Sequence, residues 1–279
     1  MPLRVYKPTT SARRRTSVDT FEDVTKKRPE KRLLMSKKDH AGRNSTGKIT
    51  VRHRGGGVKR HIRLVDFLRN RYDMPAKVTA IEYDPNRSAR LALLVFPDGV
   101  KNYMIAPQRL KVGDSVTSSQ KKIKIELGNR MPIEHIPVGV NIYDVELTPG
   151  KGGQIARSAG TLVKIMAVDG PNAQLKLPSG EIRLVHRTCL ATVGEVSNPD
   201  IMHIRIGRAG RKRHMGIRPS VRGKVMNPVD HPHGGGEGRN PIGLKHPKTP
   251  WGKPALGVKT RRKRSSDRMI LSRRKHKRR

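Results

Sequence analysis

The chain has 279 residues with 61 Lys and Arg against 22 Asp and Glu, and its net charge of +39 is far more than solubility requires. The single cysteine, Cys189, excludes a disulfide within the chain and a Cys-rich zinc site. The longest apolar run, Leu91 to Phe96, is too short to cross a bilayer. The charge therefore indicates a polyanionic partner such as RNA, and no membrane contact is expected.

Charge divides the chain into three parts. Residues 1–60 carry a net charge of +13, residues 61–199 only +6, and residues 200–279 carry +20. The balanced middle is typical of a folded protein, whereas the flanks cannot bury enough apolar surface to offset chain entropy. We expect the N-terminal flank to be disordered on its own and the C-terminal flank to be an extended arm that becomes ordered only on a partner.

The N-terminal flank ends in a basic, glycine-rich segment. Arg52-His53-Arg54 precede Gly55-Gly56-Gly57, and Lys59 and Arg60 follow. Glycines allow the backbone of another polymer to come close. A generic flexible linker would carry Ser in place of Arg and His. The segment therefore predicts contact with RNA, with a solvated linker as the alternative.

From residue 61 onward, short apolar runs alternate with turn residues, a pattern typical of small β-barrels or sandwiches. The turn Pro97-Asp98-Gly99 predicts a hairpin between the runs Leu91–Phe96 and Lys101–Ala106. The strands predicted in this first group are Lys77–Tyr83, Leu91–Phe96, Lys101–Ala106 and Leu110–Val116.

A second β group follows a stretch, Met131–Gly139, that reads as a linker because of its prolines. The predicted strands are Val140–Leu147, Leu162–Val168, Ala173–Leu177 and Ile182–His186. Between the first two lies Gly150-Lys151-Gly152-Gly153, which lacks the spacing of a nucleotide-binding loop. Lys151 could touch an RNA phosphate, and an ordinary solvated turn is the alternative.

Beyond Pro199 the chain is basic and irregular around the loop Asn227–Arg239. Prolines and four glycines exclude a helix or a sheet strand here and leave a bare backbone that suits an anion. The loop carries His231 and His233. A zinc site would need a different spacing, and a general base has no serine near it in sequence. The favoured interpretation is that the imidazoles contact RNA and pin the loop.

Aromatic residues make up 3% of the chain, too few for a platform on which single-stranded bases stack. No helix suited to reading base edges is visible. Binding should therefore depend on phosphates, 2′-hydroxyls and RNA shape.

Four stretches together resemble the bacterial large-subunit ribosomal protein two family over nearly the full length of the chain. They are Arg52-His53-Arg54-Gly55-Gly56-Gly57; Tyr83-Asp84-Pro85-Asn86-Arg87-Ser88-Ala89; Pro149-Gly150-Lys151-Gly152-Gly153-Gln154 with Ala156-Arg157-Ser158-Ala159-Gly160-Thr161; and Asn227 to Arg239 with Thr249-Pro250-Trp251-Gly252. The chain departs from the family pattern at three positions. Val58 stands where the family usually has histidine, Leu68 where it usually has lysine, and His214 where it often has tryptophan.

The resemblance implies a mainly β chain in which an OB-fold barrel at 61–128 precedes an SH3-like barrel at 129–199. Long irregular basic extensions occupy residues 1–60 and 200–279, the second embedded in RNA. It also implies a cytoplasmic, ribosomal protein that binds large-subunit (23S-type) ribosomal RNA. Further implied partners are small-subunit RNA at the subunit interface and other ribosomal proteins.

The family's function is structural: subunit association, tRNA binding and support of peptide-bond formation, without catalysis by the protein and without a cofactor or metal. The alternatives are a peptidyl transferase that acts on an RNA ester through His231 and, less well matched, a basic chromatin-like protein. The expected RNA-binding residues are Arg52, His53, Arg54, Gly55, Gly56, Gly57, Lys59, Arg60, Arg87, Lys151, Arg157, Arg213, Arg218, Arg222, His231, His233, Gly234, Gly235, Gly236, Arg239, Lys248, Trp251, Arg261 and Arg262.

Overall fold

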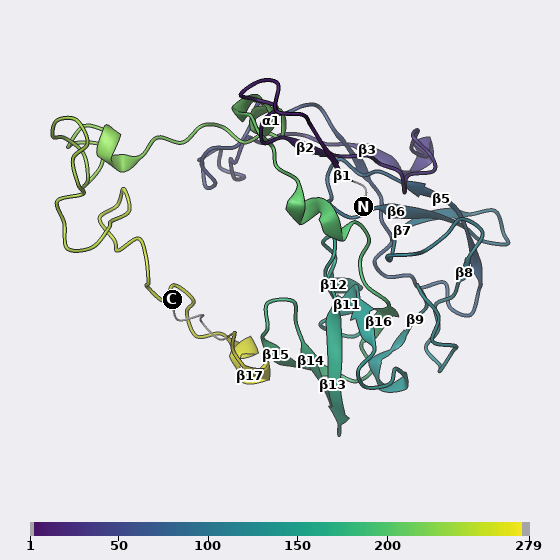
Figure 1. Cartoon of the computed structure of the whole chain (residues 1–279). Coiled ribbons are helices and arrows are strands. Elements are labelled where there is room, and N and C mark those ends of the chain that lie inside the picture. Colours follow the sequence, from purple (N-terminus) through teal and green to yellow (C-terminus); the bar gives the residue numbers. More distant parts are fainter. Residues whose placement is uncertain (1–2, 275–279) are drawn as a thin grey trace. The chain divides into compact units, whose positions relative to one another are not determined.

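The computed structural model describes residues 3–274, which form mostly short strands and turns (Figure 1). Contacts divide this part of the chain into two compact units. The first unit holds residues 3–38, 59–208 and 266–274, and the second holds residues 39–58 and 209–265. Both β groups expected from the sequence lie in the first unit.

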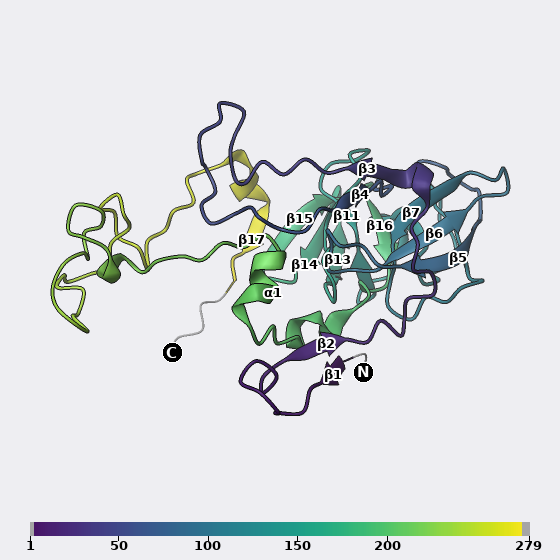
Figure 2. The same ribbon diagram turned by 90° about the horizontal axis from the view of Figure 1, so that it is seen from above.

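The first β group is an OB-fold barrel whose antiparallel sheet has the strand order β7-β6-β5-β8. Figure 2 shows β5, β6 and β7 next to one another. Its strands are β5 (Ala76–Glu82), β6 (Leu91–Val95), β7 (Lys101–Ile105) and β8 (Ser115–Val116). On β5 the side chains of Ala76, Val78 and Ala80 are buried while Lys77 and Thr79 between them are exposed, the alternation that marks a strand. Three predicted strands are thus confirmed, and the fourth is reduced to its last two residues.

The turn between β6 and β7 is the predicted hairpin. Gly99 has a φ of +77° and donates its N–H to the Phe96 carbonyl at 2.9 Å. The amide of Phe96 donates to the carbonyl of Val100 at 3.0 Å, which closes the hairpin. Glycine suits this position because L side chains rarely adopt a positive φ.

The second β group is an SH3-like barrel with a main antiparallel sheet ordered β17-β15-β14-β13-β10-β16-β9. Ile142, Ile165, Leu175 and Val185 fill its core and are almost fully buried. Figure 1 shows β13, β14, β15 and β17 side by side. The strands are β9 (Arg130–Pro132), β10 (Asn141–Tyr143), β13 (Val163–Asp169), β14 (Asn172–Lys176), β15 (Ile182–His186), β16 (Leu190–Val193) and β17 (Ile270–Ser272), with a separate pair β11 (Val145–Glu146) and β12 (Gly153–Ile155).

The predicted linker at Met131–Gly139 is wrong for its first half. Met131 and Pro132 lie in β9, which pairs with β16, and the 3-10 helix η2 (Ile133–His135) follows. Met131 and Ile133 are fully buried in the core of the second barrel. Proline is accommodated because β9 is the edge strand of its sheet, where a missing N–H costs no ladder hydrogen bond.

The expected disorder of the N-terminal flank is wrong for residues 3–36, which belong to the first unit. Thr25 is bonded to β5 through the carbonyl and amide of Ile81. Leu33 packs on a buried cluster formed by the other face of the OB sheet. The segment is therefore not free-standing, because pairing and packing on the barrel offset its loss of chain entropy. Its elements are β1 (Leu3–Val5) paired with β2 (Ser17–Asp19), η1 (Lys31–Leu33), and β3 (Leu34–Ser36) paired with β4 (His61–Arg63).

The second unit is irregular, as expected for the basic C-terminal flank. It contains the short helix α1 (Ala209–His214) and the 3-10 turn η4 (Gly223–Val225). Before it, η3 (Pro199–His203) belongs to the first unit, and after it η5 (Ser265–Met269) leads to β17, which pairs with β15. The end of the flank is thus partly built into the second barrel rather than wholly extended.

Residues 1–2 and 275–279 of the two predicted extensions lie outside the described residues. Whether the second unit orders only on a partner, and whether the domains divide at residues 60, 128 and 199, stay predictions. Within residues 3–274 no helix is long and apolar enough to cross a membrane.

Candidate nucleic-acid interface

The loop that carries His231 is folded tightly on itself. The carbonyl of Asn227 accepts the amides of Asp230 and His231, and the carbonyl of His231 accepts the amide of Gly234 at 2.8 Å. The His231 side chain lies against the backbone of Gly223, where a Cβ atom would overlap the ring. As a result His231 is only 7% exposed.

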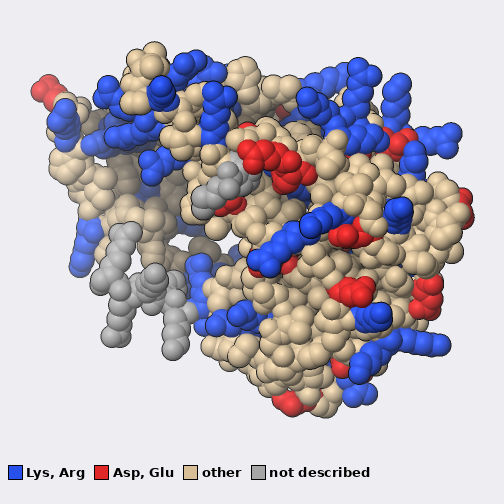
Figure 3. Space-filling model, turned by 45° about the vertical axis from the view of Figure 1, so that its right-hand side comes forward, with Lys and Arg blue, Asp and Glu red and all other residues tan. Residues whose placement is uncertain are grey.

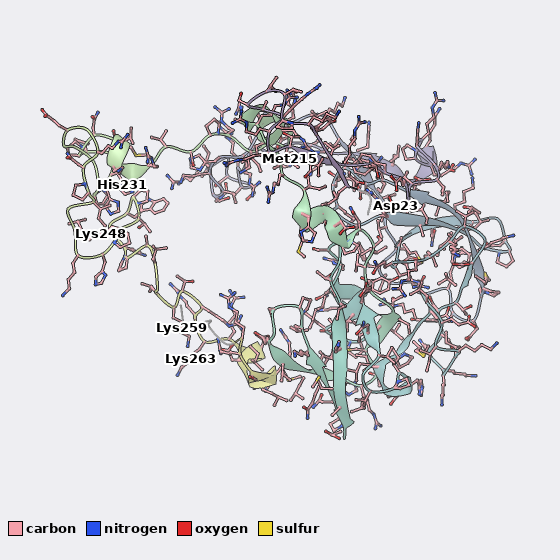
Figure 4. All side chains as sticks on the ribbon, viewed as in Figure 1. Asp23, Met215, His231, Lys248, Lys259 and Lys263 are labelled. Carbon is pink, nitrogen blue, oxygen red and sulfur yellow. The ribbon has the colours of Figure 1, made fainter. Side chains whose placement is uncertain are left out.

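The two histidines form a hydrogen-bonded chain with Lys248. Figure 4 labels His231 and Lys248, the two ends of this chain. The amide of His233 donates to Nδ1 of His231 at 3.0 Å, and the amide of Lys248 donates to Nε2 of His233 at 2.8 Å. A ring nitrogen that accepts an N–H must be unprotonated, so neutral His231 carries its proton on Nε2 and neutral His233 on Nδ1. The ring centroids are 4.8 Å apart. The imidazoles therefore join the loop to the segment that follows it.

A basic hollow opens beside this loop. Arg222, Lys224 and Arg239 line it together with backbone from Asn227, Gly235, Gly236 and Gly238. Gly234 and Gly235 pack their backbones against Asn227 and Pro228, whereas Arg222, Gly236 and Arg239 are exposed. Cationic side chains and exposed backbone amides can together bind a phosphate group.

The Arg52–Gly57 segment pairs with residues 214–218 of the same unit. Gly55 donates its amide to the Gly216 carbonyl at 3.0 Å, and His53 accepts the amide of Arg218 at 3.1 Å. A Cβ atom on Gly57 would come within 2.9 Å of Gly216 Cα, so this close approach is between two parts of the chain itself. Of the three glycines only Gly56 faces open space. Arg52, His53 and Arg54 are exposed around it.

A small hairpin presents the tryptophan. Lys248 pairs with Pro254, and the Thr249 amide donates to the Lys253 carbonyl at 2.7 Å. Trp251 at its tip is 72% exposed, and the Arg52 guanidinium lies 5.1 Å from its ring centroid. An exposed ring with a stacked cation is a suitable contact for RNA.

Three predicted cations of the first unit gather at one place. The guanidinium groups of Arg87 and Arg157 lie 5.0 and 4.6 Å from the ring centroid of Phe67. Lys151 is exposed on the turn whose Gly153 donates its amide to the Phe67 carbonyl at 3.0 Å. Arg60 joins the Tyr83–Ala89 stretch by donating to the Pro85 carbonyl at 3.1 Å. The geometry thus builds one cluster from residues far apart in the sequence.

The other predicted positions are more dispersed. Lys59, Arg218, Arg261 and Arg262 are exposed, and Arg213 is half-buried on α1. Figure 3 shows Lys and Arg side chains in separate groups among other residues, with Asp and Glu in smaller groups. Within residues 3–274, no three His, Cys, Asp or Glu side chains come together to hold a metal ion.

Two protein-family models match the chain. Residues 30–118 match the family model described as Ribosomal Proteins L2, RNA binding N-terminal domain. Residues 126–252 match the model described as Ribosomal Proteins L2, C-terminal domain. The chain belongs to the ribosomal protein L2 family.

As an L2 protein, the chain is a structural, RNA-binding constituent of the large ribosomal subunit, as the resemblance implied. The matches cover both barrels, the loop around His231 and the hairpin up to Gly252. Neither matching family is a family of enzymes, and both models describe ribosomal proteins. The protein is therefore associated with the ribosome.

A buried charge network supports the Lys151 turn of this L2 chain. Arg130 is fully buried and its guanidinium lies 3.2 Å from Asp144 and 3.1 Å from Glu146. Glu146 also accepts the amides of Gly150 and Gly152. Burial raises the pKa of the Asp144 carboxyl, an effect that Arg130 opposes. These groups face backbone amides and one another, so their role is to shape the turn.

Sequence reasoning missed two residues of the L2 surface. Lys224 lines the basic hollow and donates to the Asn240 carbonyl at 3.3 Å. Phe67 holds the cluster of Arg87 and Arg157. Lys224 could have been noticed from charge, but an isolated phenylalanine between Asp66 and Leu68 carries no signal of its own.

Proposed function

We propose that this L2 chain binds 23S-type ribosomal RNA in cytoplasmic ribosomes and contacts small-subunit RNA at the subunit interface. Other ribosomal proteins are its further neighbours. By ordering RNA it supports subunit association, tRNA binding and peptide-bond formation, and it does not itself catalyse that reaction. The RNA-binding residues are those named from the sequence, together with Lys224. Phe67 holds two of them, Arg87 and Arg157.

One observation supports the non-catalytic role above the alternative of an RNA-ester enzyme. A general base needs a free lone pair within reach of the proton that it removes. The lone pair of His231 Nδ1 accepts the His233 amide, and that of His233 Nε2 accepts the Lys248 amide. Both imidazoles therefore use their basic nitrogen inside the protein, and His231 is 7% exposed as well.

The test is a His231→Gln substitution in purified, fully assembled ribosomes, assayed for peptide-bond formation in a single turnover. Loss of one buried hydrogen bond costs about 1 kcal/mol, or up to about 3 kcal/mol if its partner stays buried and unpaired. We therefore expect a defect in assembly or subunit joining and a near-normal chemical rate. His246→Gln, at an exposed histidine of the same unit, is the matched control.

A general base would contribute about a hundredfold or more to the chemical step. A loss of that size in intact His231→Gln particles, with the usual pH dependence abolished, would contradict the proposal and favour the enzyme.

A further inference from the structure

The last described strand, β17, returns the chain to the second barrel. It lies at the edge of the main sheet, next to β15 (Figure 1). Residues 266–274 therefore belong to the first unit, although residues 209–265, directly before them, belong to the second. The segment 209–265 is thus attached to the first unit at both of its ends rather than at one.

The edge of β15 is a site that accepts a strand. On its other side β15 pairs with β14 along its whole length, from Ile182 to His186. Toward β17, Ile182 lies opposite Ser272 and Arg183 lies opposite Ile270. A strand edge without a neighbour exposes a row of N–H and C=O groups, and such a row pairs readily with another strand. β17 covers part of this edge.

Pairing rather than burial holds β17 in place. No residue of η5 or β17 is buried, and Leu271 is 53% exposed. Two positions of β17 are paired, with an irregular register between them. Arg273 after the strand lies 3.5 Å from Asp267 before it. So short a pairing is favourable because the connection through the chain keeps the strand at a high effective concentration near β15.

The segment attached in this way is strongly basic. Residues 209–265 hold 15 Lys and Arg against two acidic residues. The start of the segment is held inside the second unit, where Gly55 donates its amide to the Gly216 carbonyl at 3.0 Å. β17 follows directly after its other end. The residues between, 219–264, therefore form a basic arm that is held at both ends.

Holding both ends of the arm lowers the cost of ordering it on RNA. A segment with one free end has more conformations than a segment whose two ends are fixed, and this freedom is lost when the segment becomes ordered on a partner. A segment that is fixed beforehand loses less of it, so the same contacts give a higher affinity. The gain does not depend on a contact between β17 and RNA.

We propose that β17 is an anchor strand, which docks on the edge of β15 and thereby positions the basic arm for ribosomal RNA. The inference rests on the proposed RNA binding and adds to it the element that fixes the arm. The occupant of the β15 edge is the strand of the same molecule, because the connection through residues 209–265 keeps that strand closer than any strand of a second copy.

The first test removes the pairing and keeps every charge. Proline has no N–H to donate to a sheet, so Ile270→Pro combined with Ser272→Pro should release β17 from β15. We expect the affinity of this full-length anchor variant for deproteinised large-subunit ribosomal RNA to fall about tenfold. The slope of log affinity against log salt should stay unchanged, because the cations that contact phosphates are all retained.

Val258→Pro combined with Thr260→Pro is the matched control, since it places two prolines in an exposed and irregular part of the arm. It should leave both affinity and slope unchanged. Hydrogen exchange checks the fold of the anchor variant. The amides of β15 and β17 should exchange faster, while those that pair β13 with β14 should stay protected.

The second test restores the anchor by a covalent bond. Arg183→Cys combined with Ile270→Cys places two thiols at opposed positions of an antiparallel pair, where Cα atoms lie close enough for a disulfide. Adding Ser272→Pro weakens the pairing, so the disulfide alone then holds β17. The chain's own Cys189 is fully buried and does not compete. The oxidised protein should bind the RNA about tenfold more tightly than the reduced protein, although the two have the same charge.

Three outcomes would overturn the inference: unchanged affinity or a flatter slope in the anchor variant, an equal loss in the control, or equal binding by the oxidised and reduced proteins. A concentration-dependent dimer of the original chain in light scattering would assign the β15 edge to a second copy, and would overturn it as well. If the anchor variant does not fold, the oxidised and reduced proteins decide. Failure of the proposed function looks different, because the unsubstituted protein would then bind the RNA without a steep salt dependence.

Discussion

At the scale of single residues, arginine carries much of the internal structure as well as the surface charge. All three phenylalanines lie under guanidinium groups, and Arg90 and Arg130 are buried with acidic partners. Cations therefore fix neighbouring segments in this protein. Substituting either member of such a buried pair should lower the stability of the protein, because the remaining charge cannot reach water.

We predict that Arg130→Met destabilises the protein by about 3–5 kcal/mol, because it leaves Asp144 and Glu146 buried without a counter-charge. Equilibrium unfolding by urea measures the change. Arg187→Gln is the control, since Arg187 is exposed and pairs with Glu134 at the surface, where a pair contributes about 1 kcal/mol or less. Equal losses in the two variants would show that the network of Arg130 is not important for stability.

The buried thiol of Cys189 belongs to the same region. Burial raises its pKa to about 12, with Glu146 adding to the effect. A thiol that is fully buried and protonated is unreactive at neutral pH. Cys189 is therefore a core residue of the second barrel and not a nucleophile.

At the scale of elements, the N-terminal segment covers the outer face of the OB-fold sheet. Leu33 packs on the cluster of Ala80, Leu91, Leu93 and Tyr103. The Tyr103 hydroxyl accepts the Glu30 amide at 2.9 Å and donates to Glu82. Strands two and three of an OB-fold form the face that usually binds oligonucleotides. Here Leu33 of the chain's own N-terminal segment packs on that sheet.

We predict that the segment is ordered in the free protein. In hydrogen exchange by mass spectrometry or NMR, the amides of Thr25 and Leu64 should be protected, because they donate to the carbonyls of Ile81 and Leu33. Tyr103→Phe removes the hydroxyl that joins Glu30 to Glu82, and it should speed exchange around Glu30 by about five- to tenfold, for a loss of about 1 kcal/mol. Uniformly fast exchange over residues 17–36 without RNA would contradict this.

At the scale of the whole molecule, charge and fold are separated along the chain. Residues 61–199, which form most of the two barrels, have a net charge of only +6, whereas residues 200–279 have a net charge of +20. Yet β17 belongs to the second barrel, so deleting the end of the chain would also uncover the edge of β15. The electrostatic role of the tail must therefore be tested without removing this strand.

We predict that replacing Arg261, Arg262, Lys263 and Arg264 by Gln flattens the salt dependence of ribosomal RNA binding. Each lost phosphate contact should reduce the slope by about 0.7 to 0.9, because these exposed side chains can reach RNA. Binding titrations at several salt concentrations measure the slope. Replacing the exposed cross-strand pair Lys164 and Lys176 by Gln is the control for loss of charge from a barrel surface. An unchanged slope in the tail variant would show that this part of the tail does not lie on RNA.

The sequence by itself determined the two barrels, the RNA-binding class and most of the longer strands. β5, β6 and β7, and later β13, β14 and β15, were readable because alternating apolar residues and Pro-Asp-Gly or Asp-Gly turns are local features. The two basic flanks could also be identified from the sequence, because net charge depends only on composition. Four glycine-rich or loop motifs were enough to indicate the family.

Only the tertiary structure decided what those local features contact. β9 and β16 have three and four residues, too few for a periodic signal, and their place is set by pairing with each other. The burial of His231 depends on Gly223, and the site at Phe67 depends on Arg87 and Arg157, far along the chain. Such contacts form when distant segments pack together, and the order of residues along the chain does not reveal them.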